Sequence, residues 1–282
     1  MSERKNVLLL FSKLPEPGLV KTRLTTLKDG MFTPEIASAL YHRMLFDVVE
    51  IVCRAFDRLE EEDSPGGATD AYELVISTAP VENVSRMEAL FAEAGTWPRP
   101  ITFIGDTGAT FDEHYNDAFR QVWKSGADCI LSMGADMPAL TVDDVVDGFR
   151  ALHKLEDEAD GRGIVISPDQ ELGVSIIGWT RATDFDHNGV FYNQEGLTVL
   201  PAYVRKAAAA NLPAIYLRPV PDVDTMADLF HTATLLEATN YCAPYDGNCP
   251  GYRTWEMLVD LGLNEIRIPP NPLHDPREHI DT

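Results

Sequence analysis

The sequence has little positive charge, and this shortage excludes two classes of partner. Its 282 residues include 23 Lys and Arg against 45 Asp and Glu, so the formal net charge is −22. Surfaces that bind nucleic acid or anionic lipid neutralise phosphates with clustered Lys and Arg. We therefore expect no nucleic-acid partner and no anionic membrane surface. A site for an anionic substrate has to concentrate its few cations locally.

Long apolar runs and cysteines are also scarce. The apolar run at residues 7–11 is too short for a secretory signal or a membrane span, so we expect no membrane span and a cytoplasmic location. Four cysteines in a chain of this length do not form a disulfide framework. Cys53 and Cys129 fall in helical and strand patterns, as small core residues do. Cys242 and Cys249 flank a turn and are the one pair close enough in sequence to suggest a disulfide or a metal.

Apolar residues make up 45% of the chain, which is enough for a folded core. Short apolar runs alternate with helical patterns, which predicts βαβ crossovers and a mostly parallel α/β sheet. Residues 164–166 and 174–177 are separated only by a short polar loop, so at least one strand is expected to run antiparallel. Strands are expected at residues 7–11, 73–77, 101–104, 129–133, 164–166, 174–177 and 214–217. Helices are expected from residue 84 and after the N-terminal caps Thr33, Thr110, Thr141 and Thr225.

Two segments lack a regular pattern. Residues 59–70 contain three consecutive glutamates and Pro-Gly-Gly, which favours a solvated loop. The tail after Tyr241 is rich in Pro, Asn and Asp and is expected to be irregular, with one short helix at residues 255–261. We therefore predict one α/β domain at residues 1–240 and an irregular C-terminal extension at residues 241–282.

The loop that follows the first strand, residues 12–24, is a candidate phosphate site. It holds three of the 23 basic residues, Lys13, Lys21 and Arg23. Ligands of open α/β sheets bind beyond the carboxyl ends of the strands, and both Lys and Arg suit a diphosphate. Gly18 would let the backbone approach a ligand closely. The alternative is a surface loop with ordinary solvated cations.

A carboxylate follows the fourth strand at the same expected edge of the sheet. Mg²⁺ and Mn²⁺ commonly bind one or two protein carboxylates together with the phosphates of a substrate, and Asp136 is in a suitable position to supply such a carboxylate. The alternative role for Asp136 is to cap the next helix, but Thr141 already fills that position. Asp136 is therefore a predicted metal ligand.

A second acidic segment precedes the last strongly predicted helix. Thr225 and Asp228 have the spacing of a cap and its reciprocal partner, which explains both residues structurally. Asp224 lies before the cap and has no such explanation. We predict that Asp224 is the second metal ligand, and Asp222 is the less favoured candidate.

In this order, residues 11–24, 134–141 and 222–229 resemble the signatures of the bacterial DUF2064 group. That group is similar to the nucleotide-diphospho-sugar transferase (GT-A) superfamily, which also contains nucleotidyltransferases such as the molybdenum-cofactor guanylyltransferases. The resemblance covers roughly residues 6–230. It implies a Rossmann-like GT-A fold, a three-layer αβα sandwich with a mostly parallel mixed sheet. It also implies a bound nucleotide, a divalent metal (Mg or Mn) at Asp136 and transfer chemistry.

The sequence departs from this group where the acceptor is expected. Members commonly carry Asp-Gly-Gly-Tyr after the fifth strand, whereas residues 168–175 keep only Asp169 and one glycine. Asp169 or Glu171 is a possible acceptor-side base, so the predicted catalytic residues are Asp136 and Asp169. Residues 105–110 match a Gly-Asp-Leu-Gly element of the group only loosely. His114 could approach the site, but a surface position is the more common one for such a histidine, as it is for His187.

The function expected from these segments is that of a metal-dependent nucleotide-diphospho-sugar transferase, a glycosyltransferase-like enzyme. It would move a sugar from a nucleotide-sugar donor to an unknown small-molecule acceptor. One alternative is a nucleotidyltransferase that uses a nucleoside triphosphate. Another is a non-catalytic nucleotide-binding protein, which the altered segment at residues 168–175 leaves open.

Overall fold

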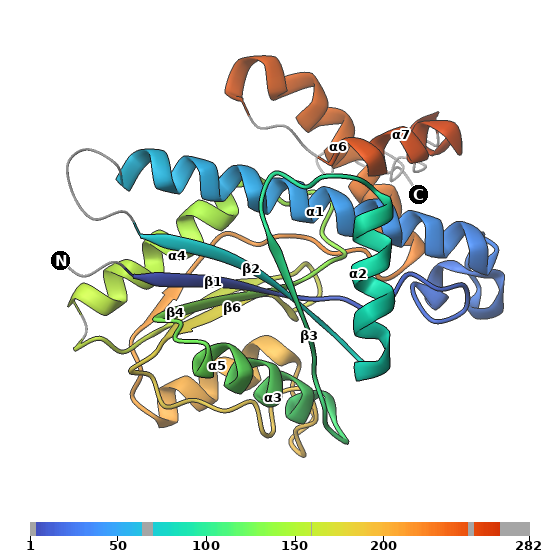
Figure 1. Ribbon diagram of the computed structural model, residues 1–282. Helices are drawn as coiled ribbons and strands as arrows, with labels where there is room; N and C mark the ends of the chain where they lie inside the picture. The colour runs from blue at the N-terminus through green and yellow to red at the C-terminus, as the bar shows by residue number, and fades with distance from the viewer. Residues whose placement is uncertain (1–3, 64–69, 159, 248–250, 266–282) are drawn as a thin grey trace, which may run out of the picture.

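A seven-stranded sheet with helices on both faces forms the centre of the protein in the computed structural model (Figure 1). The structure describes residues 4–63, 70–158, 160–247 and 251–265. The strand order is β3-β2-β1-β4-β6-β5-β7, in which β6 runs antiparallel to β4 and β5 and all other pairs are parallel. The strands are β1 (Lys5–Phe11), β2 (Ala71–Thr78), β3 (Ile101–Gly105), β4 (Cys129–Gly134), β5 (Ile164–Pro168), β6 (Val174–Thr180) and β7 (Ala214–Tyr216). The predicted mixed, mostly parallel sheet is confirmed.

The helices form two layers because the central strands are apolar on both faces. Alternate side chains of β1 enter two separate apolar clusters, Leu8 on one face and Leu9 on the other. The helices are α1 (Pro34–Asp63), α2 (Val84–Glu93), α3 (Phe111–Lys124), α4 (Val142–Glu158), α5 (Val199–Ala209), α6 (Met226–Asp246) and α7 (Tyr252–Asp260). The first cluster includes side chains of α1, α2 and α4, and the second includes side chains of α3 and α5. Short 3-10 helices lie at Thr22–Leu24, Thr26–Lys28, Val81–Asn83 and Leu263–Glu265.

The order of the strands creates a switch point beside β1. The chain moves outward from β1 to β2 and β3, then crosses to the other side of β1 to form β4. At such a point the loops after two neighbouring parallel strands diverge, and this divergence leaves a crevice at their carboxyl ends. The loop after β1 carries the predicted phosphate residues, and the loop after β4 carries Asp136; the other predicted metal ligand, Asp224, lies between β7 and α6.

Three local predictions differ from the structure. Residues 59–63 continue α1 instead of forming a loop, because Leu59 is buried on the face of the helix that meets the core and glutamate favours helix. Helix α5 was not predicted, although its Ala-rich sequence favours helix. Residues 241–246 continue α6, so the start of the predicted irregular extension is helical. Cys242 is a free, exposed thiol, whereas Cys249 lies outside the described residues.

The two C-terminal helices lie against α1 and form a third apolar cluster (Figure 1). Leu236 of α6 and Leu258 of α7 join Leu40 of α1 in this cluster. The start of α7 is also held by Asp47 of α1, whose carboxylate accepts hydrogen bonds from the backbone N–H groups of Arg253 and Thr254 at 3.0 and 2.7 Å.

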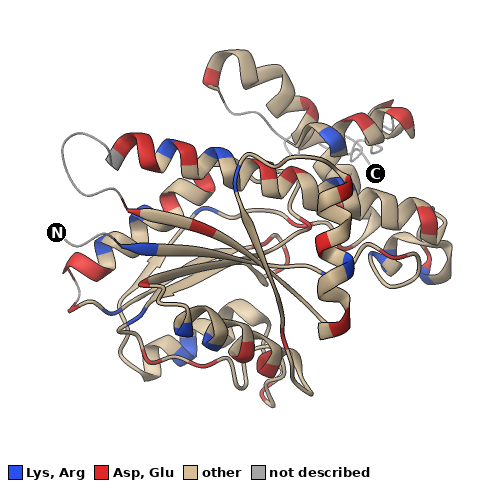
Figure 2. Ribbon diagram, in the orientation of Figure 1, with Lys and Arg blue, Asp and Glu red and all other residues tan. Residues whose placement is uncertain are grey.

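Acidic residues are spread along α1, α2 and α7, with fewer Lys and Arg among them (Figure 2). This distribution fits the excess of Asp and Glu in the sequence. In the described part of the chain, no helix is both long and apolar enough to cross a membrane.

His187 is fully buried, which corrects the expectation of a surface position. Its ring lies among Tyr115, Trp179 and Phe191, and its Nδ1 is 3.1 Å from Asn116 Oδ1. Its Nε2 has no hydrogen-bond partner among the described residues. Burial therefore lowers the pKa of His187 to about 3.

We expect His187 to make the protein sensitive to acid. In the unfolded chain His titrates near pH 6.5, so between about pH 6.5 and 3 only the unfolded state binds this proton, and stability falls as the pH falls. The slope is about 1.4 kcal/mol per pH unit in that window. His187→Phe is expected to remove this part of the slope, measured as free energy of unfolding against pH. The exposed His231→Phe is the control, and equal slopes in the wild type and His187→Phe would contradict the assignment.

Candidate active site

A cleft of about 690 Å³ lies at the carboxyl ends of β1 and β4. Segments that are far apart in sequence line it, including the loop after β1, the loop after β4 and the segment before α6. The charged residues that line the cleft are Lys13, Lys21, Arg23, Asp106, Asp136, Asp222 and Asp224. Most of the predicted site residues are therefore brought together at the predicted edge of the sheet.

The loop after β4 holds Asp136 close to the end of the strand. A Cβ added to Gly134 would lie 2.9 Å from Asp136 Oδ1, so the carboxylate occupies space that a side chain at residue 134 would fill. The backbone N–H of Val223 donates to the carbonyl oxygen of Asp136 at 3.0 Å. This bond joins the loop after β4 to the segment that carries Asp224.

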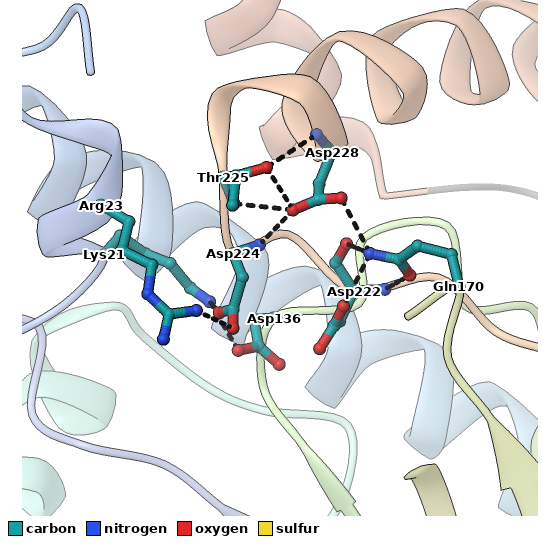
Figure 3. Close-up of polar contacts among 8 residues, drawn as sticks. All are labelled: Lys21, Arg23, Asp136, Gln170, Asp222, Asp224, Thr225 and Asp228. Atoms are coloured by element: carbon teal, nitrogen blue, oxygen red, sulfur yellow. Dashed lines mark hydrogen bonds and ion pairs between the residues drawn. The ribbon is translucent and has the colours of Figure 1, made fainter. Parts of the chain in front are cut away.

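Lys21 lies between the two predicted metal ligands (Figure 3). Its Nζ is 2.6 Å from Asp136 Oδ2 and 3.1 Å from Asp224 Oδ1, and its side chain is only 6% exposed. Burial alone would lower the pKa of Lys21, but the Asp136 and Asp224 carboxylates outweigh it and raise that pKa above its ordinary value. The lysine is therefore a fixed positive charge between two carboxylates.

Buried side chains hold the loop of Lys21 in place. Leu24, one turn after Lys21, enters the third apolar cluster together with Val223, the neighbour of Asp224. Gly30 lies so close to Leu24 that a Cβ on residue 30 would be 2.2 Å from the Leu24 carbonyl carbon, so only glycine fits there. The same cluster that packs α6 and α7 on α1 therefore supports both sides of the Lys21–Asp224 contact.

The other predicted phosphate residues differ in their surroundings. Arg23 donates from Nη1 to Asp224 Oδ2 at 3.1 Å, and its side chain is largely exposed. Lys13 lines the cleft, is exposed, and forms no ion pair with any residue that the structure describes. Gly18 has a φ of 80° in an exposed turn and does not line the cleft. Its role in binding stays a prediction.

Asp222 faces the cleft from the segment before α6 (Figure 3). Burial and the charges of Asp136 and Asp224 raise the pKa of Asp222 to about 7. Its carboxylate accepts a hydrogen bond from Gln170 Nε2 at 3.0 Å, and the same nitrogen donates to Asp228 Oδ1 at 2.9 Å. Gln170, which sequence reasoning did not single out, thus joins the β5–β6 hairpin to the acidic segment.

The helix start beyond Asp224 is built as predicted. The Thr225 hydroxyl accepts from the backbone N–H of Asp228, and Asp228 accepts from the backbone N–H of Thr225, so the two form a reciprocal cap. Asp228 Oδ2 also accepts from the Asp224 N–H at 3.2 Å. The cap therefore fixes the backbone that presents Asp224 to the cleft.

Asp169 lies in the tight turn between β5 and β6. Its Oδ1 accepts hydrogen bonds from the backbone N–H groups of Glu171 and Gly173 at 2.7 and 2.8 Å. Neither Asp169 nor the exposed Glu171 lines the cleft. The contacts of Asp169 stabilise the hairpin, and its catalytic role stays a prediction without a contact that supports it.

The cleft is also lined by an Asp–His pair. Asp106 follows β3 and is 3% exposed; its Oδ1 is 2.5 Å from Nδ1 of His114 on α3. Sequence reasoning named His114 only as a weak candidate and gave no role to Asp106. The signal available was the loose match at residues 105–110, which places an aspartate directly after a parallel strand.

Comparison with solved structures shows which fold this chain shares with known proteins. The structure of a protein from Desulfovibrio desulfuricans G20, itself provisionally named a nucleotide-diphospho-sugar transferase, has a TM-score of 0.67 and 23% identity to this chain. The match covers 93% of this chain and 97% of that one. At this identity the likeness shows the fold, which is the Rossmann-like, GT-A-type αβα sandwich that the resemblance implied.

The family match is narrower than the structural one. Residues 67–194 match the family described as "Uncharacterized protein conserved in bacteria (DUF2064)", which confirms the resemblance over that segment. No curated protein matches the chain.

More distant structures are also similar. A cytidylyltransferase from Leptospira borgpetersenii serovar Hardjo-bovis has a TM-score of 0.44 and 11% identity, with 94% of this chain and 98% of that chain covered. A 4-diphosphocytidyl-2C-methyl-D-erythritol synthase from Anaerococcus prevotii DSM 20548 has a TM-score of 0.43 and 10% identity, with 83% and 99% covered.

Proposed function

We propose that the protein is a divalent-metal-dependent transferase that takes a sugar from a nucleotide-diphospho-sugar donor. The observation that carries this proposal is the ion cluster in the cleft, where Lys21 lies 2.6 and 3.1 Å from Asp136 and Asp224. Carboxylates and cations at the carboxyl edge of a switch point suit a metal-bound diphosphate.

The charge of the cleft supports a metal. Three cationic and four acidic side chains line it, so it has no excess of positive charge to offer a diphosphate. A nucleoside diphosphate would meet carboxylates as well as cations there, and its charge would be repelled without a further cation. A divalent ion held by Asp136 and Asp224 would give the cleft an excess of positive charge toward the diphosphate.

The residues present fit such an ion. Carboxylate oxygens are the ligands that Mg²⁺ and Mn²⁺ prefer, and Asp136 and Asp224 already share one cation, the Lys21 ammonium. Among the described residues, no three or more His, Cys, Asp or Glu side chains are grouped to hold a metal. Two protein carboxylates, phosphate oxygens and water are the ligand set that we propose.

Each side chain then has a defined task. Asp136 and Asp224 would hold the metal, which supplies positive charge beside the leaving diphosphate. Lys21 would transfer its contact from the carboxylates to a phosphate oxygen, because two cations do not share the same oxygens at close range. Arg23 and Lys13, both exposed at the cleft, would bind the outer phosphate oxygens.

The proposal is tested by thermal stabilisation with nucleoside diphosphates, triphosphates and sugar nucleotides, each with and without Mn²⁺. A ligand that binds only the native state raises the free energy of unfolding, by about 2.7 kcal/mol at a ligand concentration of about 100 times its Kd. The melting temperature rises with it. We expect stabilisation that requires both the metal and one nucleotide, with a preference for the sugar nucleotide. Metal-independent binding, or no binding, would contradict the proposal. Pyrophosphate release from a bound triphosphate would indicate nucleotidyl transfer instead.

A further inference from the structure

The Asp106–His114 pair has the geometry of an oriented base. The Asp106 carboxylate is nearly buried, accepts a hydrogen bond from the Ser77 hydroxyl at 2.6 Å, and lies 2.5 Å from His114 Nδ1. A carboxylate oxygen accepts hydrogen bonds, so Nδ1 is the ring nitrogen that donates to Asp106, and Nε2 is the one that remains to accept a proton from a ligand. Ser77 donates to Asp106 and not to His114, so the three residues do not form a hydrolase triad.

His114 belongs to the same cleft as the ion cluster. Its side chain is 25% exposed and lines the cleft together with Asp106 and Ser77. The ion cluster comes from the loops after β1 and β4 and from the segment before α6, whereas the Asp–His pair comes from the end of β3 and the start of α3. The cleft therefore has two chemically different sides, one suited to a metal and phosphates and one suited to accepting a proton.

Two exposed aromatic rings also line the cleft, and one of them lies one helical turn before His114. Phe111, three residues before His114 on α3, is 42% exposed, and Tyr192 is 66% exposed; both line the cleft. Phe111 packs edge to face on Phe191, with ring centroids 4.6 Å apart. An exposed aromatic surface in a cleft suits the apolar face of a ring in a ligand, because such contact removes apolar area from water.

We propose that His114 is the general base that activates the acceptor, with Asp106 as its positioning residue, and that the acceptor is a hydroxyl group on a ring. This inference rests on the proposed function. The acceptor oxygen forms a bond to the anomeric carbon of the donor sugar while the bond from that carbon to the diphosphate oxygen breaks. The electron pair of the broken bond stays on the nucleoside diphosphate, and the hydroxyl proton moves to His114 Nε2 and then to solvent.

The test uses the sugar nucleotide that stabilises the protein most, with Mn²⁺ and two acceptor probes, methyl α-glucoside and 4-methylphenol. Release of the nucleoside diphosphate is measured with each probe. Removing a general base costs about 10²–10⁴-fold in rate. His114→Ala is expected to lower kcat by at least about 100-fold and to leave the Kd for the nucleotide within about threefold. The faster probe identifies the ring as a carbohydrate or a phenol.

Three further measurements separate a base from a merely structural residue. Added imidazole is expected to restore a large part of the rate of His114→Ala, because it replaces the missing base. Asp106→Asn is expected to lower kcat with little change in the acceptor KM, whereas Tyr192→Ala is expected to raise the acceptor KM. His231→Ala, an exposed change on α6, is the control and is expected to keep wild-type rates.

Several outcomes would overturn the inference. They are a His114→Ala rate within threefold of wild type, a lost rate that imidazole does not restore, and no turnover of either probe by a protein that binds the donor with Mn²⁺. In all three cases metal-dependent nucleotide binding can persist, and the proposed donor site then stands without this base. Absence of nucleotide binding by the wild type would instead refute the proposed function itself.

Discussion

Asp136→Asn is expected to weaken metal-dependent nucleotide binding by about 100-fold or more. The change removes one of the two carboxylates proposed to hold the metal, and a loss of about 2.7 kcal/mol corresponds to a hundredfold change in affinity. The fold is expected to survive, because the substituted side chain has the same shape and Lys21 keeps its contact with Asp224 at 3.1 Å. Calorimetric titration with the best nucleotide in Mn²⁺ measures the effect.

The matched control for this variant is Asp147→Asn. Asp147 lies on α4, is 58% exposed and pairs only with Arg150 among the described residues, at 3.4 Å. Its change is expected to leave both stability and nucleotide affinity near wild type, as for most exposed ion pairs. Undiminished metal-dependent binding by Asp136→Asn would refute the assignment of Asp136 as a metal ligand.

Lys21→Gln is expected to destabilise the metal-free protein and to make it bind Mn²⁺ more tightly. Removing the ammonium leaves the Asp136 and Asp224 carboxylates close together without their shared cation. Because these carboxylates are 27% and 45% exposed, water screens part of the repulsion, and we expect a loss of about 1–3 kcal/mol in the free energy of unfolding. Denaturant unfolding without metal measures this loss.

Manganese provides the second half of the test. In the wild type the metal has to displace the Lys21 ammonium from both carboxylates, whereas in Lys21→Gln it meets them without a competing cation. Mn²⁺ alone is therefore expected to stabilise Lys21→Gln more than the wild type. Arg23→Gln is the matched control, because Arg23 contacts the same Asp224 from a side chain that is 65% exposed. Equal stabilisation of wild type and Lys21→Gln by Mn²⁺ would contradict the exchange of the two cations.

Local patterns in the sequence were sufficient for most of the fold. The apolar run at residues 7–11 is buried on both faces as β1, and the spacing of Thr225 and Asp228 gives the reciprocal cap at the start of α6. Each feature depends on residues that are only a few positions apart, so a short stretch of sequence is enough to predict it. The errors at residues 59–63 and at α5 arose where polar or Ala-rich sequence forms a helix whose burial depends on distant segments.

The sequence by itself predicted which segments would line the cleft, since Lys21 and Asp136 follow predicted strands and Asp224 precedes a predicted helix cap. Only the tertiary structure placed the ammonium of Lys21 between carboxylates that lie 115 and 203 positions away. It also assigned Asp169 to a turn and oriented His114 on Asp106. The type of a residue limits the roles that its side chain can have. The residues that it contacts and its burial decide which of these roles it has in the folded protein. Those partners are fixed by the crossover at β1 and β4 and by the packing of α6 and α7 on α1.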